Sequence, residues 1–139
     1  MKARIVDNDI ILRLDIGDNI VDSLKQVCRE FNIKTASISG IGATDDFTCG
    51  VFNISTKSYK EIHFSGMYEI LSLCGNISRM NNEPYVHLHI TVGDESCSSF
   101  GGHLIEARIS ATAEIFIHTL DCEVARVRDE AVGLNLLDI

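Results

Sequence analysis

Apolar and polar residues alternate along several short stretches of this chain, and one stretch follows a different period. Over residues 10–16 every second side chain is apolar, which predicts a half-buried β-strand. Over residues 20–31 the apolar side chains recur every three or four positions, which predicts an amphipathic helix. Asp18 or Asn19 is placed to cap the start of that helix, and Asn32 to end it in a left-handed conformation.

Strand patterns dominate the rest of the chain. Short apolar or alternating runs between turn residues predict strands at residues 35–39, 47–54, 57–64, 68–77, 85–92, 105–109 and 113–120. A loop is expected at 93–102, a short final strand around 122–127, and an apolar tail at 134–139 that docks on the body or on a neighbouring subunit. The pattern indicates a single domain over residues 1–139. It is α+β, with a mostly antiparallel sheet of about seven strands and one main N-terminal helix.

The most informative chemistry lies in the predicted strand at 85–92 and the loop that follows it. His87 and His89 are two positions apart, so on a strand they point to the same face, while the residues between and beside them are apolar. His103 follows the flexible pair Gly101 and Gly102. Three neutral imidazoles meeting at one point would suit a divalent transition metal with an open coordination position.

These residues also have plainer interpretations, which the sequence leaves open. His87 and His89 could be surface residues, or be partly buried and hydrogen-bonded in a subunit interface without metal. Gly101 and Gly102 either allow close approach of a neighbouring strand or form an ordinary turn, and the direct proximity of His103 favours close approach.

Several other residues are weaker candidates for chemistry. Glu114, Glu106 and Asp94 could orient a ligand imidazole or act as a base, but solvated charges and turn residues are the more common explanation. Cys97 precedes His103 and could form a nucleophile–base pair with it, although a free loop thiol is the better expectation.

Charge and cysteine content narrow the possible partners and compartment. The formal net charge is −8, with 20 acidic and 12 basic residues, and the basic residues do not cluster. Direct DNA binding and binding to an anionic membrane are therefore not expected, because both depend on clustered Lys and Arg. Five widely spaced cysteines with no Cys-x-x-Cys, and no secretory signal pattern, indicate reduced thiols in a cytoplasmic protein.

Five short motifs in order resemble the Plant and Prokaryote Conserved (PPC) domain family. The similarity covers the chain from about Arg13 to its C-terminus. The motifs are Gly-Ile-Gly at 40–42, Tyr-Glu-Ile-Leu-Ser-Leu-Cys-Gly-Asn-Ile at 68–77, Pro-Tyr-Val-His-Leu-His-Ile-Thr-Val-Gly-Asp at 84–94, Phe-Gly-Gly-His-Leu at 100–104 and Ala-Glu-Ile-Phe-Ile at 113–117.

The resemblance implies an α+β homotrimer with a mostly antiparallel sheet. Plant members carry Arg-Gly-Arg-Pro hooks that bind DNA, whereas prokaryotic members are usually single domains labelled as DNA-binding. Some of these prokaryotic members are similar to metalloproteins that bind zinc through histidines matching His87, His89 and His103. This chain has no hook, and it carries Met67 where plant members have Arg. It retains the histidines that plant members replace, which favours the prokaryotic branch.

Taken together, the sequence predicts a homotrimeric PPC-domain protein with a three-histidine zinc site at His87, His89 and His103. It is DNA-binding or transcription-associated by family label, and contact through a protein partner is more compatible with its charge than direct DNA binding. The alternative is a metal-dependent enzyme that acts on a small polar substrate, with Glu114 or Glu106 as proton carrier.

Overall fold

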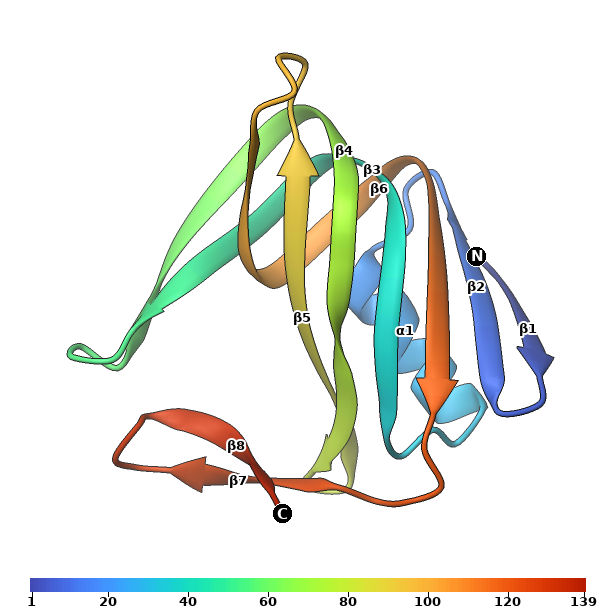
Figure 1. Ribbon diagram of the computed structural model, residues 1–139, viewed down its shortest axis with the longest axis vertical. Helices are drawn as coiled ribbons and strands as arrows, with labels where there is room; N and C mark the ends of the chain where they lie inside the picture. Colours follow the sequence, from blue (N-terminus) through green and yellow to red (C-terminus); the bar gives the residue numbers. More distant parts are fainter.

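The computed structural model describes residues 1–139 and contains one helix and eight strands (Figure 1). In chain order the elements are β1 (Lys2–Val6), β2 (Asp9–Asp15), α1 (Ile20–Glu30), β3 (Ala36–Asn53), β4 (Ser58–Met80), β5 (Glu83–Gly93), β6 (Ser99–Thr119), β7 (Ala125–Asp129) and β8 (Leu134–Asp138). No helix is long and apolar enough to cross a lipid bilayer.

The strands form a sheet in the order β1-β2-β6-β3-β4-β7-β8, with β5 paired to both β4 and β6. Every pairing is antiparallel except the one between β4 and β7, which consists of the single parallel pair Arg79 and Ala125. The predicted mixed α+β fold, with one helix and a mostly antiparallel sheet, is confirmed. The sheet has eight strands rather than about seven.

Three pairs of predicted strands are in fact three long strands. β3 covers the runs at 35–39 and 47–54, β4 those at 57–64 and 68–77, and β6 those at 105–109 and 113–120. The ladder between β3 and its neighbours shifts register near Gly40–Gly42 and Thr44–Asp46. A bulge changes which face each side chain occupies without ending the ladder, so the apolar alternation breaks while the strand continues. Because β6 begins at Ser99, the connection after β5 is also shorter than the predicted loop at 93–102.

The two ends of the sheet differ from the prediction. The sequence pattern does not predict β1. This strand pairs only with β2 and all five of its residues are exposed, so it lacks the alternation of buried and exposed residues that marks a strand. The final strand around 122–127 is displaced to β7, and the apolar tail is β8, which pairs with β7 in a C-terminal hairpin.

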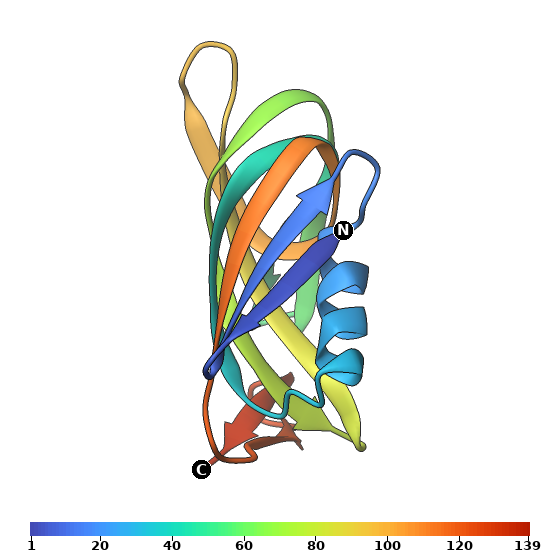
Figure 2. The same ribbon diagram turned by 90° about the vertical axis from the view of Figure 1, so that its right-hand side faces the viewer.

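The helix forms where the sequence predicts it. Asn19 is the N-cap, and its Oδ1 accepts hydrogen bonds from the backbone N–H groups of Val21 and Asp22 at 3.0 and 3.2 Å. The apolar stripe of α1 is buried against the sheet, and Figure 2 shows the helix on one side of the strands. Asn32 has a φ of 52°, the expected left-handed residue after the helix.

The opposite side of the sheet has no covering element and exposes four large apolar side chains. On β2 and β6 the residues buried under the helix alternate with Ile11 and Phe116, which are cross-strand partners. Ile41 pairs with Glu114, two residues before Phe116, so it shares this face. These residues, with Leu71 beside Ile41, form what we call the outer apolar face: Ile11, Ile41, Leu71 and Phe116.

β3, β4, β5 and β6 close on one another. β5 pairs with β4 along its length and with the first part of β6 through His89–His103 to Gly93–Ser99, while β4 and β6 both pair with β3. Aromatic rings pack together in this region, with Phe47 stacked on Phe64 at 4.9 Å and Tyr68 edge-on to Phe47 at 5.3 Å. The closure places β5 and β6 side by side at the histidines.

Two glycines allow this closure. A Cβ on Gly101 would lie 1.9 Å from the carbonyl oxygen of Ile90 on β5, and a Cβ on Gly102 would lie 2.7 Å from the carbonyl oxygen of Gly50 on β3. Both positions therefore serve close backbone approach, the first of the two interpretations of this pair.

We expect Gly101→Ala to lower the free energy of unfolding by roughly 1–3 kcal/mol, the usual range for overpacking. The new Cβ forces β6 away from β5, since the clash is with backbone. Urea denaturation measures the change. Gly93→Ala is the matched control, because its Cβ would meet only the end of the Leu71 side chain, at 3.2 Å. Equal stability of Gly101→Ala and the wild type would contradict the assigned role.

Candidate metal centre

The paired strands β5 and β6 bring three histidines together. His87 and His89 share one face of β5, because Leu88 between them is buried on the other face. His103 on β6 is the direct register partner of His89. The ring centroids are 5.0 to 5.6 Å apart, and one nitrogen of each ring lies within 4.8 Å of the other two. The three residues selected from the sequence therefore converge; we call them the histidine cluster.

One nitrogen in the histidine cluster has no partner. Nδ1 of His103 is fully buried and makes no hydrogen bond. The ring is held in place by Tyr59, whose side chain stacks on it with the centroids 4.8 Å apart. A buried polar atom without a partner costs about 1–3 kcal/mol, so such atoms usually mark a missing ligand, water or ion. A metal ion bound through this nitrogen would satisfy it.

The electrostatics favour neutral imidazoles, the form that binds metal. Burial lowers the pKa of His103 to about 4, with smaller contributions from the neighbouring His87 and His89. Burial also lowers the pKa of His87, assisted by the positive charge of Arg126. At neutral pH both rings therefore keep a lone pair available for a ligand.

Arg126 of β7 lies against His87. Its Nη2 is 3.3 Å from Nδ1 of His87 and 2.8 Å from Oδ1 of Asn76. Its Nε donates to Oγ of Ser78 at 2.8 Å, and its Nη1 donates to the carbonyl oxygen of Asn135 at 2.7 Å. The guanidinium group also lies 4.7 Å above the ring of Tyr85. These contacts dock the C-terminal hairpin beside the histidine cluster.

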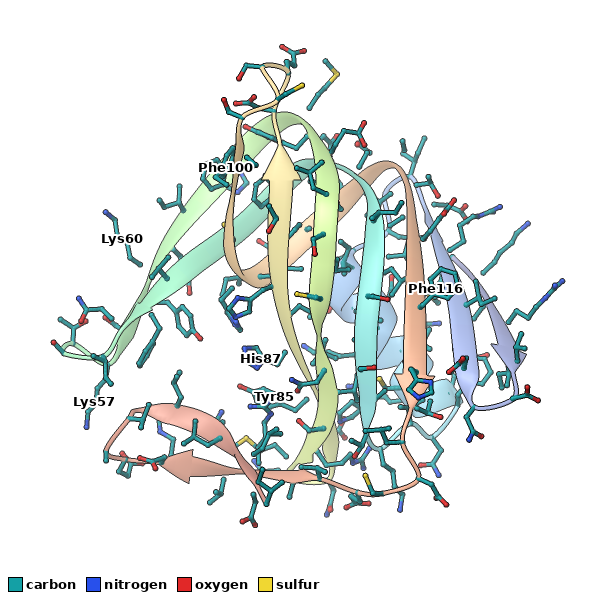
Figure 3. All side chains as sticks on the ribbon, in the orientation of Figure 1. Lys57, Lys60, Tyr85, His87, Phe100 and Phe116 are labelled. Carbon is teal, nitrogen blue, oxygen red and sulfur yellow. The ribbon has the colours of Figure 1, made fainter.

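A cavity of about 450 Å³ adjoins the cluster; we call it the histidine cavity. Figure 3 shows His87 and Tyr85 pointing from β5 into the space between the β3–β4 hairpin and the β7–β8 hairpin. The two hairpins also meet at their tips, where Nζ of Lys57 donates to the carbonyl oxygen of Glu130. The lining residues are Gly50, Val51, Phe52, Tyr59, Tyr85, His87, His89, Gly102, His103, Arg126, Leu134, Asn135 and Leu136.

The weaker candidates do not reach this cavity. Glu114 lies beside Ile41 on the other side of the sheet, and Glu106 is exposed outside the lining. Asp94 accepts hydrogen bonds from Ser96 and Ser98 and so shapes its own turn. The exposed Cys97 belongs to that same turn and is not paired with His103. The plainer interpretation of these residues is therefore correct.

Sequence reasoning missed the second half of the site. Arg126, Asn135 and the leucines of β8 lie some 40 positions or more after His87. The local signals for this hairpin are the predicted short strand around 122–127 and the apolar tail at 134–139, expected to dock on the body or on a neighbouring subunit, and neither points to the histidines. Nothing in the local pattern distinguishes Arg126, which binds at the site, from Arg128, which pairs with Glu130 at 3.5 Å.

The chain is similar to three solved structures over nearly its full length. A protein from Bacteroides thetaiotaomicron, described as a "putative DNA binding protein", is 36% identical, with a TM-score of 0.95 and coverage of 99% of this chain and 96% of that one. A PPC protein from Pyrococcus horikoshii is 35% identical, with a TM-score of 0.88 and coverage of 94% and 91%. A metal-containing protein from Archaeoglobus fulgidus is 33% identical, with a TM-score of 0.90 and coverage of 96% and 95%.

The family comparison agrees with these structures. No curated protein matches the chain. The family model of the Plants and Prokaryotes Conserved domain matches residues 1–121, which include α1, β1 to β6 and all three histidines of the cluster. The chain belongs to the Plants and Prokaryotes Conserved domain family, also written PPC.

Proposed function

We propose that this protein is a homotrimeric metal-binding member of the PPC family, with zinc held by His87, His89 and His103. Two observations carry the proposal: one nitrogen of each of the three imidazoles lies within 4.8 Å of the other two, and Nδ1 of His103 is buried without a partner in the protein. The similarity to a protein described as metal-containing supports it.

Zinc is the metal that this donor set suits best. Imidazole nitrogens bind zinc well, and sites with three protein ligands typically leave a fourth position open. Tetrahedral coordination at about 2.0–2.1 Å needs ligand atoms roughly 3.4 Å apart. The atoms here lie within 4.8 Å of one another, so the imidazole rings must move closer together to complete the arrangement. A zinc ion so held supplies Lewis-acid polarisation at its open position.

The net charge bears on the DNA-binding description of the relative from Bacteroides thetaiotaomicron. A net charge of −8, with no cluster of Lys and Arg in the sequence, disfavours nonspecific binding to DNA phosphates. For the association with transcription that the family description suggests, we therefore propose contact through a protein partner.

A metal-dependent enzyme is the second candidate, and the histidine cavity favours it because it gives a small molecule access to the cluster. Glu114 and Glu106 are not its proton carriers, since neither lines the cavity. The groups that line it and can donate or accept a proton are the tyrosine hydroxyls of Tyr59 and Tyr85 and the imidazoles themselves.

Protein purified without a histidine tag is expected to carry about one zinc per chain by elemental mass spectrometry. The double variant His87→Ala/His89→Ala removes two of three ligands and should reduce the content to near zero. His63→Ala/His118→Ala is the matched control, because both histidines are exposed and lie outside the cluster. A content near zero in the wild type would rule out the metal site.

The metal-free protein is expected to lose stability as the pH falls from about 6.5 to about 4. The pKa of His103 is about 4 in the folded protein, against an ordinary value near 6.5 when unfolded. Between these values the unfolded chain binds a proton that the folded one does not, so protonation favours unfolding. In the presence of a chelator, the thermal unfolding temperature of His103→Gln should depend less on pH over this range than that of the wild type or of His63→Gln. Identical pH dependence in all three proteins would be the contrary result.

The proposed trimer is expected to form through the outer apolar face, since exposed apolar patches of this kind commonly mark subunit contacts. Phe116→Glu places a charge in that face and should reduce the mass measured by light scattering from three chains to one. Val127→Glu is the control, because Val127 is 53% exposed, close to the 52% of Phe116, but lies on the C-terminal hairpin. An unchanged mass for Phe116→Glu would assign the contact to another surface.

A further inference from the structure

The histidine cavity has a charge opposite to that of the protein as a whole. No Asp or Glu is among its lining residues, although the chain carries 20 acidic and 12 basic residues. Arg126 contributes a positive charge, and the imidazoles of the cluster carry none when neutral. A divalent ion at the cluster would therefore keep its full charge. Two uncompensated cationic groups in a partly desolvated cavity attract an anion.

Arg126 has no anionic partner in the protein. Its four hydrogen bonds go to a hydroxyl, an amide oxygen, a backbone carbonyl and an imidazole, all neutral acceptors. Arg128, two residues later on the same strand, does pair with a carboxylate, that of Glu130. A guanidinium group has five N–H donors, so one N–H, on Nη1, is free in this structure.

Metal binding at His87 frees a second N–H of Arg126. Arg126 can only donate, so in their contact Nδ1 of His87 is the acceptor. If His87 binds a metal through Nδ1, that lone pair is used; if it binds through Nε2, Nδ1 carries the proton of the neutral ring. In both cases the acceptor is lost, and Nη1 and Nη2 each have one free N–H. Two such groups match the two oxygens of a carboxylate.

The rest of the cavity is mostly apolar, and this limits the kind of anion. Phe52 and Tyr59 of the β3–β4 hairpin face it from one side, and Leu134 and Leu136 of β8 from the other. Few donors remain beyond Arg126: the imidazole N–H groups, the tyrosine hydroxyls and the side-chain amide of Asn135, which already donates to the hydroxyl of Tyr85 at 3.4 Å. A phosphoryl group would leave acceptors unpaired here, which is costly, whereas a carboxylate needs fewer donors. A volume of about 450 Å³ lies within the range of small-molecule sites.

We propose that the histidine cavity binds a small organic carboxylate with an aromatic or aliphatic body, its carboxylate held between Arg126 and the ion at the histidine cluster. The inference rests on the proposed metal site, because that ion supplies part of the charge and releases Arg126 from His87. Metal and carboxylate therefore bind with positive coupling.

The test is calorimetric titration. The zinc-loaded and the metal-free wild-type protein are each titrated with benzoate, benzamide and phenyl phosphate. Benzamide has the same shape as benzoate without the charge, and phenyl phosphate presents the phosphoryl alternative. Benzoate should bind the zinc-loaded protein at least tenfold more tightly than the metal-free protein, and more tightly than either analogue binds. In cobalt-loaded protein, benzoate should also change the visible absorption spectrum of the metal.

Variants of the two arginines locate the anion contact. Arg126→Gln removes the charge and should weaken benzoate binding at least tenfold, as expected for the loss of a charge-assisted hydrogen bond. Arg126→Lys keeps the charge without the planar pair of donors, and should bind benzoate with an affinity between those of the wild type and Arg126→Gln. Arg128→Gln makes the same change in charge on the same strand outside the cavity, and should leave benzoate binding unchanged.

The outcomes separate this inference from the proposed function. No zinc in the wild-type protein would overturn both. One zinc per chain, with benzoate bound no more tightly than benzamide, would overturn the carboxylate ligand alone and leave the metal site standing. Tighter binding of phenyl phosphate than of benzoate would also overturn it, in favour of a phosphoryl ligand. Equal weakening by Arg126→Gln and Arg128→Gln would remove Arg126 from the site.

Discussion

The structure depends on one constraint above all: β5 is hydrogen-bonded on both edges, to β4 on one side and to β6 on the other. The backbone of β6 can lie this close because Gly101 has no side chain. This double pairing closes four strands around the aromatic side chains, and it sets His103 directly opposite His89. The same ladder that stabilises the fold thus determines the geometry of the histidine cluster.

The site combines burial with an uneven distribution of charge. Burial keeps imidazole rings neutral, which raises the free energy of protonation but prepares them as ligands. Arg126 brings a positive charge to the same place, and the acidic side chains of the chain lie elsewhere. Burying an arginine that has only neutral partners costs free energy of folding. Beside a cluster of ligand residues, the same unpaired charge is available to bind an anion.

The cavity is built from two parts of the chain, and the family model matches only one of them. The histidines lie within residues 1–121, which match the family model, whereas the hairpin of β7 and β8 lies beyond them. The hairpin joins the sheet through one parallel pair, and the contacts of Arg126 and Lys57 hold it over the cavity. The donors of the cluster therefore come from the part of the chain that the family model matches, and much of the surrounding wall comes from the C-terminal hairpin.

The sequence by itself determined the elements whose burial follows one regular period over most of their length. These are β2, the helix with its Asn19 cap, and the histidine strand, because periodic burial leaves a local record in the order of residues. Only the tertiary structure decided that three pairs of runs are single bent strands, since a bulge breaks the alternation but not the hydrogen bonding. Likewise, it alone placed Arg126 against His87 and Glu114 on the far side of the sheet, because long-range pairing is set by packing between strands and not by neighbours along the chain.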